Sequence, residues 1–353
     1  MTTKSAKLAV SITVISTIIL IILRLSFRSD FKFESSEKQF SLSTSKNENS
    51  LYDLTREDSL LVFLHIQKTG GTVFGIHLLK DIEGFSCPCA LRSGKKRRHC
   101  ECYHPGNHQL WYFSRYTRGW ICGVHPDYTT LIHCLPNLLE RKTEELQQNT
   151  LTGTVTDKPD VTPNYLYVTL LRDPIHRYLS EYRHTKLGAK WPLREAQCKH
   201  GKFYLDANVK QQNASNCFPD GAEDWKGVTL DEFMECELNP AANRMAKMLA
   251  DLTSIKCNED LLKNKEIVDE MMLQSAKSNL EKFAYFGLTE FQRESQGLFE
   301  KTFGISFTKE FEQQETNASK MNLTSNTEAR LQEINYLDME LYRWAKELFL
   351  SRL

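Results

Sequence analysis

The sequence has no excess of charge of either sign. Its 353 residues carry 45 Lys and Arg against 45 Asp and Glu, so the chain has no overall field that would gather nucleic acid nonspecifically. Any anion-binding site must therefore be local. The chain also has no internal repeat, and its 41% hydrophobic content is enough for a large core, which excludes a disordered protein.

Long apolar runs are scarce, and the only strong one is residues 8–23, with basic residues on both sides. Its sixteen residues are slightly fewer than the roughly 17 to 20 that a membrane span needs. The sequence LRLSFRSD after it has no small-x-small cleavage site, which favours an uncleaved anchor over a signal peptide. We predict a short cytoplasmic tail (1–7) and a transmembrane signal anchor (8–25).

Cysteines and glycosylation sequons indicate which side of the membrane holds the body. An oxidising, glycosylating lumen suits ten cysteines and three sequons, which are Asn213-Ala-Ser215, Asn317-Ala-Ser319 and Asn322-Leu-Thr324. A type II membrane protein is therefore expected. Residues 26–58 are rich in Ser, Lys, Glu and Asn without a helical or strand period, which predicts a flexible stem before a lumenal body of residues 59–353.

Two closely spaced cysteine pairs, Cys87-Pro-Cys89 and Cys100-Glu-Cys102, allow two interpretations. One is a zinc site, but its pairs are normally spaced C-x2–4-C rather than C-x-C. The other is a set of disulfides that brace a loop. We favour the disulfides, and the sequence leaves their pairing open.

Short apolar runs alternate with helical patterns along the body, which predicts an α/β fold around a mainly parallel sheet. The clearest strands are Leu60–Ile66, Tyr165–Leu171 and Ala284–Leu288. The clearest helices are 72–80, 174–186, 229–236, 241–252, 267–282, 290–302 and 328–350. The stretches 143–163 and 199–227 are expected to be loops. The last helix carries an apolar stripe, for which packing on its own domain is favoured over a coiled-coil partner.

The first strand runs into the turn Lys68-Thr69-Gly70-Gly71-Thr72 before a helix. In parallel sheets ligands lie beyond the carboxyl ends of strands, and a Gly-rich turn that enters a helix presents backbone N–H groups to an anion. The turn is not a Walker A loop, because its Lys precedes the glycines. A simple tight turn remains the alternative at this point.

The second strand ends in a similar feature. Arg172 stands at its carboxyl end, Asp173 suits a helix N-cap, and Pro174 suits the first helical position. Ser180 follows about two turns into the helix, near the face of Arg177. Solvated or acid-paired arginines are the alternative, but two anion-ready strand ends in one sheet favour a shared anion site.

These motifs together resemble one family. The words FLHIQKTGGT, CGVH, LLRDPIHRYLSE, LDEFMEC, ANRMAKMLADL, FGLTEFQ and LDMELYRWAKELF are similar to those of the heparan-sulfate 6-O-sulfotransferases. The similarity covers about residues 59–353, and all ten cysteines fall where this family has cysteines. The resemblance implies the sulfotransferase fold, a central parallel sheet flanked by helices that is related to the P-loop kinases.

The resemblance also implies an activity and a location. It implies transfer of a sulfuryl group from 3′-phosphoadenosine 5′-phosphosulfate to the 6-hydroxyl of glucosamine in heparan sulfate, in the Golgi lumen and without a metal. Three alternatives stay open: a sulfotransferase acting on another acceptor position, a noncatalytic heparan-binding membrane protein, and a kinase. The oligomeric state is left open as well.

Donor and catalytic residues follow from the same resemblance. It places the 5′-phosphosulfate on His65, Ile66, Gln67, Lys68, Thr69, Gly70, Gly71, Thr72 and Val73, the 3′-phosphate on Arg172 and Ser180, and a closing segment on Ser319 and Lys320. Lys68 is expected to stabilise charge on the leaving oxygens. His125 is expected to be the general base, since a His pKa of about 6.5 is close to the working pH. A buried structural His is the alternative for His125.

Acceptor residues are implied in a Cys-bounded loop and at aromatic positions. The cationic run is Lys95, Lys96, Arg97 and Arg98, for which a solvated cluster or a processing site is the alternative. Aromatic rings pack well on sugars, and the positions implied beside His125 are Trp111, Trp120, Tyr182 and Trp191. Core packing is an alternative for Trp120. The chain departs from the family at Val73, Ile76, Tyr128 and Tyr182, which affects the expected acceptor specificity rather than the reaction class.

Overall fold

The computed structural model describes residues 50–91, 98–104, 109–136, 163–189, 196–199, 202–205, 224–237, 239–313 and 320–353. The predicted cytoplasmic tail and anchor, and most of the predicted stem, lie outside these residues. Within the described part of the chain, no helix is long and apolar enough to cross a membrane.

Four parallel strands form the central sheet, in the order β4-β1-β5-β8. The strands are β1 (Ser59–Leu64), β4 (Tyr112–Phe113), β5 (Asn164–Leu171) and β8 (Tyr285–Leu288). Leu61 lies opposite both Leu166 and Tyr112. Every residue of β1 and of β8 is buried, as expected for a parallel sheet that is covered on both faces. The three predicted strands are confirmed, whereas β4 was not predicted because two residues carry no periodic pattern.

Ten helices have bounds within the described residues. They are α2 (Gly71–Lys80), α4 (Pro174–Lys186), α5 (Leu230–Glu235), α6 (Arg244–Leu249), α7 (Thr253–Lys256), α8 (Glu259–Leu262), α9 (Lys265–Lys282), α10 (Gln292–Phe303), α11 (Ser325–Ile334) and α12 (Tyr336–Arg352). Residues 128–136 are helical as well. The Asp173 side chain accepts the N–H of His176 at 2.9 Å and Pro174 opens α4, which confirms the predicted start of that helix.

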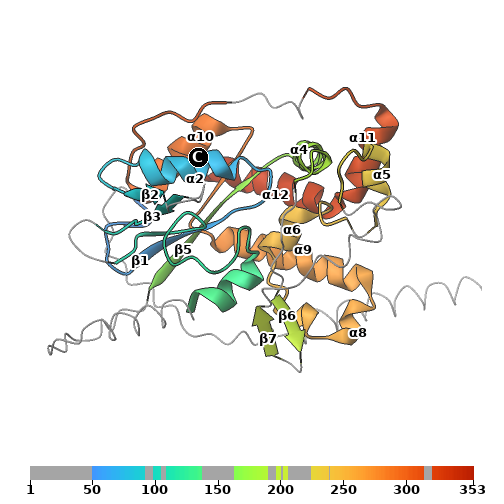
Figure 1. Ribbon diagram of the computed structural model, residues 1–353, viewed down its shortest axis with the longest axis horizontal. Coiled ribbons are helices and arrows are strands. Elements are labelled where there is room, and N and C mark those ends of the chain that lie inside the picture. The colour runs from blue at the N-terminus through green and yellow to red at the C-terminus, as the bar shows by residue number, and fades with distance from the viewer. Residues whose placement is uncertain are drawn as a thin grey trace, which may run out of the picture. The chain divides into compact units, whose positions relative to one another are not determined.

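Helices cover both faces of the sheet (Figure 1). The Tyr285 ring of β8 lies 5.9 Å from Phe74 of α2 and 4.9 Å from Phe299 of α10. The next residue, Phe286, lies 6.3 Å from Phe349 of α12. Successive side chains of a strand point to opposite faces, so α2 and α10 lie on one face and α12 lies on the other. The predicted α/β architecture is confirmed.

The predicted helix 328–350 is wrong in one respect, because it consists of two helices. The break falls at Asn335, whose φ of −108° and ψ of 27° are not helical. The buried Asn335 amide donates to the carbonyl of Leu331 at 2.9 Å, and its oxygen accepts the N–H of Asn243 at 3.3 Å. The expected packing of the apolar stripe on its own domain is confirmed by the burial of Leu337 and Leu341.

Disulfides brace the loops around the sheet. Four bonded pairs have both cysteines within the described residues, and these are Cys87–Cys102, Cys89–Cys100, Cys122–Cys134 and Cys198–Cys257. The first two hold the hairpin of β2 (Cys89–Leu91) and β3 (Arg98–Cys100). Cysteines bonded to each other are not available as zinc ligands, so the disulfide interpretation of the two C-x-C pairs is confirmed. A second hairpin, β6 (Ala196–Lys199) with β7 (Lys202–Leu205), falls partly in the expected loop 199–227.

Residues 50–58 pack on the folded body, although the sequence assigned them to the stem. The N–H groups of Leu51 and Tyr52 both donate to the carbonyl of Thr302 at 3.0 Å. The side chain of Leu54 is only 1% exposed and belongs to the main core. The body therefore begins by residue 50 rather than at residue 59.

We expect Leu54→Ala to lower the free energy of unfolding by about 2–5 kcal/mol, because it removes a fully buried side chain from the core. The matched control is Leu51→Ala, since Leu51 is 73% exposed and a surface change of this kind costs about 0.5 kcal/mol or less. Denaturant unfolding of both variants measures the difference. Equal stabilities would show that burial of the Leu54 side chain does not stabilise the body.

Candidate active site

The loop between β1 and α2 is held in place through its carbonyl groups. Four of its carbonyls accept hydrogen bonds from side chains, three of which come from other parts of the chain. The pairs are His65 O with His125 Nδ1 at 2.9 Å, Ile66 O with Thr69 Oγ1 at 3.0 Å, Lys68 O with Arg172 Nη1 at 3.1 Å, and Thr69 O with Thr289 Oγ1 at 2.7 Å. In a trans peptide the following N–H points away from the carbonyl. Anchoring the carbonyls therefore turns the N–H groups of the loop away from these partners.

The backbone of this loop requires its glycines. Gly70 has a φ of 81°, and even Lys68 has a positive φ of 67°, a region that most side chains disfavour. A Cβ atom at Gly71 would lie 2.6 Å from His65 Nε2 and 2.9 Å from Phe63 Cζ. Gly71 therefore has to be glycine for α2 to begin this close to β1. The first N–H groups of that helix have no intrahelical acceptor and form an anion-binding end.

A cavity of about 390 Å³ lies beside this loop. Its lining residues are His65, Gln67, Lys68, Gly70, Gly71, Thr72, Val73, Arg115, His125, Arg172, Ser180 and His184. The side-chain amide of Gln67 and Nδ1 of His65 are buried without a hydrogen-bond partner. Buried polar atoms are nearly always paired in native proteins, so these groups fit a polar ligand in the cavity.

A hydrogen bond to the backbone orients the His125 ring. Its Nδ1 donates to the carbonyl of His65 at 2.9 Å, so the lone pair of the neutral ring is on Nε2. Burial lowers the pKa of His125 to about 4, the hydrogen bond to His65 opposes that change, and the charges of Arg115 and Arg244 add to it. His125 is therefore neutral at neutral pH, and its basic nitrogen is Nε2.

Cationic groups lie beside the loop. Burial and the charge of Arg172 lower the pKa of Lys68, while Glu181 opposes the change. Burial likewise lowers the pKa of Arg172, against the raising effect of Glu290. Burial also lowers the pKa of His184, and the charge of Lys68 contributes to this. Lys68 and Arg172 thus bring positive charge into one small space, as an anion-binding site requires.

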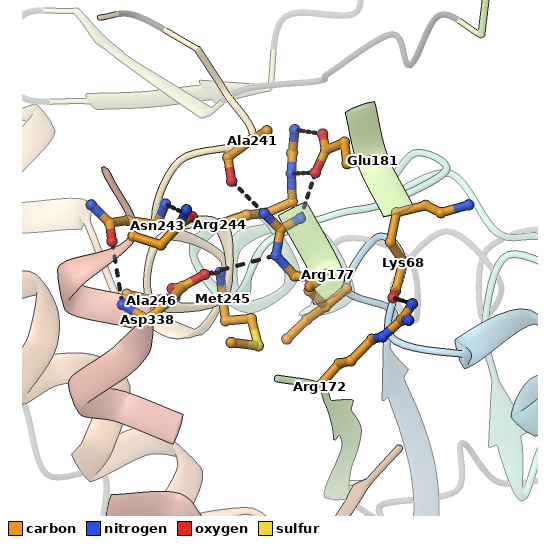
Figure 2. Close-up of polar contacts among 12 residues, drawn as sticks. Lys68, Arg172, Arg177, Glu181, Ala241, Asn243, Arg244, Met245, Ala246 and Asp338 are labelled. Atoms are coloured by element: carbon orange, nitrogen blue, oxygen red, sulfur yellow. Dashed lines mark hydrogen bonds and ion pairs between the residues drawn. The ribbon is translucent and has the colours of Figure 1, made fainter. Parts of the chain in front are cut away.

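A buried ion network joins α4 to α6 and α12 (Figure 2). Glu181 accepts from Arg177 Nη1 at 2.5 Å and from Arg244 Nε at 2.9 Å. Asp338 lies 3.8 Å from Arg177 Nε and accepts the N–H groups of Met245 and Ala246. Burial alone would raise the pKa of Glu181, but Arg244 and Arg177 hold it below its ordinary value. The alternative that the sequence left open for Arg177, pairing with acids, is therefore correct.

The structure brings most predicted donor residues together. Lining the cavity are His65, Gln67, Lys68, Gly70, Gly71, Thr72, Val73, His125, Arg172 and Ser180. Ile66 and Thr69 are buried and do not line it; Thr69 instead stabilises the loop. Lys320 lies in the described part of the chain, as does the backbone of Arg98 in β3, whereas Ser319, Lys95, Lys96, Arg97 and Trp191 lie outside it.

The predicted aromatic contacts fall into two groups. Trp111 is fully buried, with its ring 4.7 Å from Phe85. Tyr182 is buried as well, and its hydroxyl donates to the carbonyl of Val228 at 3.0 Å. Neither ring offers a face to a sugar. The structure therefore corrects their predicted role in acceptor binding, because both are packing residues. Trp120 packs against Phe113 at 4.9 Å and is only partly buried.

Sequence reasoning missed two residues that line the cavity, Arg115 and His184. Arg115 comes two residues after β4, which is too short to predict, so no sequence signal marks it. His184 follows Ser180 by four residues on α4, and this helical spacing places it on the same face. That spacing could have identified His184.

Comparison with known proteins agrees with this geometry. The model of the Sulfotransferase family matches residues 53–345. The chain belongs to this family. Within it the chain belongs with the heparan-sulfate 6-O-sulfotransferases, as the sequence motifs indicated. Heparan-sulfate 6-O-sulfotransferase 2 of Gallus gallus is 42% identical over 296 residues, which are 84% of this chain and 68% of that protein.

Two human proteins show similar sequence identity to this chain. Heparan-sulfate 6-O-sulfotransferase 3 of Homo sapiens is 41% identical over 86% of this chain and 61% of its own length. Heparan-sulfate 6-O-sulfotransferase 1 of Homo sapiens is 40% identical over 90% of this chain and 72% of its own length. This sulfotransferase thus spans about two thirds of the length of these relatives. The family uses 3′-phosphoadenosine 5′-phosphosulfate as its sulfuryl donor.

We expect Gly71→Ala to lower the free energy of unfolding by about 1–3 kcal/mol, because the new methyl group overlaps His65 and Phe63. Gly297→Ala in α10 is the matched control, since nothing lies within 4 Å of a Cβ there and the change should raise stability by about 0.4–1 kcal/mol. Thermal unfolding compares the two. A neutral Gly71→Ala would mean that the loop does not need its close approach to β1.

Glu181→Gln should destabilise the fold by about 3–5 kcal/mol, since it removes the buried carboxylate that Arg177 and Arg244 share. Glu340→Gln is the control, because Glu340 pairs with Lys277 at 2.7 Å on the surface and such pairs contribute about 0–1 kcal/mol. Denaturant titration measures both. Similar small losses for the two variants would show that the buried network is not needed for stability.

Proposed function

We propose that this sulfotransferase transfers the sulfuryl group of 3′-phosphoadenosine 5′-phosphosulfate to the 6-hydroxyl of glucosamine in heparan sulfate. The observation that supports this most is the neutral His125, whose Nε2 lies in the same cavity as the anion-binding start of α2. The three relatives described above are named for this reaction.

The donor has two anionic ends, and the cavity offers two cationic places. The loop His65–Val73 and the start of α2 suit the phosphosulfate, because helix-terminal N–H groups favour an anion. Arg172 and Ser180 at the end of β5 and on α4 suit the 3′-phosphate. The unpaired amide of Gln67 gives this end of the cavity both a donor and an acceptor for the ligand. We assign Lys320, with Ser319, to the closing segment over the donor.

The chemical step needs a base, positive charge and alignment. His125 Nε2 takes the proton of the sugar hydroxyl as its oxygen forms a bond to sulfur and the bond from sulfur to the phosphate oxygen breaks. Lys68 and the loop N–H groups stabilise the charge that develops on the departing oxygen. These fixed charges supply the stabilisation, so the proposed step uses no metal. Among the described residues no group of three or more His, Cys, Asp or Glu is placed to hold one.

For the acceptor, a polyanion, we propose contacts with the cationic run Lys95–Arg98 and with Trp120 and Trp191. Arginine and lysine suit sulfate and carboxylate groups, and flat aromatic rings pack well on sugar faces. Val73 and Ile76 add an exposed apolar pair on α2, where the family has Thr and Arg. This difference supports a distinct preference for the sugars next to the reacting glucosamine.

We propose a Golgi location, with the body on the lumenal side of a single type II anchor at residues 8–25. The disulfides support an oxidising compartment. The three sequons support a glycosylating one.

His125→Ala in the full-length protein should reduce transfer by at least about 100-fold, because general base catalysis typically contributes that much. The assay supplies radiolabelled-sulfate donor and N-sulfated heparosan, followed by disaccharide analysis. His133→Ala is the control, since His133 contacts Thr253 at 3.2 Å and does not line the cavity.

Each other outcome favours a specific alternative. Label on the 2-position of the uronic acid would indicate another acceptor position. A folded protein that binds donor and heparan sulfate without transfer would be a noncatalytic binding protein. Turnover with ATP and magnesium would indicate a kinase, and normal activity of His125→Ala would exclude His125 as the base.

A further inference from the structure

Arg115 makes an unusual set of contacts for a residue that lines the cavity. Its Nη1 donates to His125 Nε2 at 3.2 Å, and its Nη2 donates to Thr72 Oγ1 at 3.0 Å and to the Tyr116 hydroxyl at 2.6 Å. Its Nε is buried without a partner. The guanidinium therefore bridges the base and the second residue of α2.

This contact blocks the base. Nδ1 of His125 is already used by the carbonyl of His65, so Nε2 is the only nitrogen that can take a proton. The hydrogen bond from Arg115 occupies the lone pair of that nitrogen. Arginine stays charged at any working pH, so it cannot relay the proton. His125 can act on a hydroxyl only after Arg115 turns away from Nε2.

An anion at the start of α2 would attract the Arg115 guanidinium away from His125. Thr72 lies where the helix N-terminus favours negative charge, and Arg115 already reaches its hydroxyl. A sulfonate or phosphate oxygen is a stronger acceptor for a guanidinium than a hydroxyl or a neutral imidazole, because both partners are then charged. The unpaired Nε provides a further N–H for such an anion.

We propose that Arg115 is a positioning residue that holds His125 blocked until the anionic donor occupies the loop, and then turns to the donor and releases Nε2. Donor binding is thereby coupled to activation of the base. The inference rests on the proposed function for the identity of the donor and the role of His125. It does not depend on which sugar position accepts the sulfuryl group.

Other charges near His125 have to be considered in a test. Arg244 of α6 lowers the pKa of His125 and Glu181 of α4 raises it. The His65 ring lies 4.6 Å from the His125 ring, and burial, His125 and Arg115 lower the pKa of His65, so modification of His65 is followed separately in each variant. Arg244 and Glu181 are unchanged by the test. These two residues pair with each other in the buried network and remain in every variant below. A change caused by Arg115 can therefore be separated from theirs.

The test measures the reaction of His125 with diethyl pyrocarbonate in the full-length protein. This reagent modifies neutral imidazole nitrogen, and peptide mass spectrometry resolves His125 from the other histidines. In the wild type the pH midpoint of modification is expected below the ordinary His pKa of about 6.5, and saturating 3′-phosphoadenosine 5′-phosphate raises it. In Arg115→Ala the midpoint without ligand is expected above that of the wild type, because a neighbouring positive charge has been removed.

Binding of the same ligand gives a second measurement. Arg115→Ala should weaken binding of 3′-phosphoadenosine 5′-phosphate about 10- to 100-fold, as expected for loss of a charged hydrogen bond. Arg115→Lys keeps the positive charge but not the paired N–H donors of the guanidinium. It should therefore keep the low pH midpoint and still bind 3′-phosphoadenosine 5′-phosphate more weakly than the wild type does. Arg118→Ala is the matched control on the same loop, since the Arg118 side chain is 75% exposed and pairs with Glu101; both measurements should stay at wild-type values.

The proposal is wrong if Arg115→Ala leaves the pH midpoint and the ligand affinity unchanged, or if the ligand does not raise the wild-type midpoint. If Arg115→Ala does not fold, Arg115→Gln keeps a donor of similar length without the charge and must raise the midpoint in the same way. Neither measurement needs an acceptor. Failure to sulfate heparan sulfate with these results intact would overturn the proposed function and leave the role of Arg115 standing.

Discussion

The site depends on the anchored carbonyl groups of the loop that joins β1 to α2. Four carbonyls of the loop point to the protein and accept hydrogen bonds. The donors come from the residue after β5, the segment after β8, the His125 loop and the loop itself. Fixing the carbonyls fixes the peptide planes, so the N–H groups are oriented before any ligand arrives. Preorganised donors of this kind need no rearrangement when charge develops. The glycines permit the geometry, but the anchoring side chains select it.

The same anchors connect binding with catalysis. Arg172 holds the carbonyl of Lys68 and also lines the cavity, so one guanidinium both shapes the loop and supplies charge. His125 holds the carbonyl of His65 and thereby selects its own tautomer. A change in either side chain alters the loop backbone as well as the chemistry. This double use explains why the loop is surrounded by buried polar side chains, which are otherwise costly inside a protein.

The features of the fold and the site that could be predicted were those with a long or local sequence pattern. The loop after β1 and the start of α4 were predicted because a long apolar run, the glycines, Asp173 and Pro174 are local signals. The break between α11 and α12 was not, because Asn335 and Asn243 meet only in the folded chain. Trp111 and Tyr182 are aromatic residues of the type that often contacts sugars, but only the tertiary structure reveals that their rings are buried. Arg115 was missed because the strand before it has only two residues.

Burial and neighbouring charge act together on His125. Burial keeps its imidazole neutral, and the nearby arginines reinforce this, so His125, the proposed base, is unprotonated at neutral pH. A base of low pKa is a weak one, and general base catalysis is most effective when the pKa is close to the working pH. An anionic ligand that neutralises the arginines would raise the pKa of His125 toward that range. Under the proposed function, the charge of Arg115 that is to turn to the donor also lowers the pKa of His125 in the empty site, in addition to the larger effect of burial.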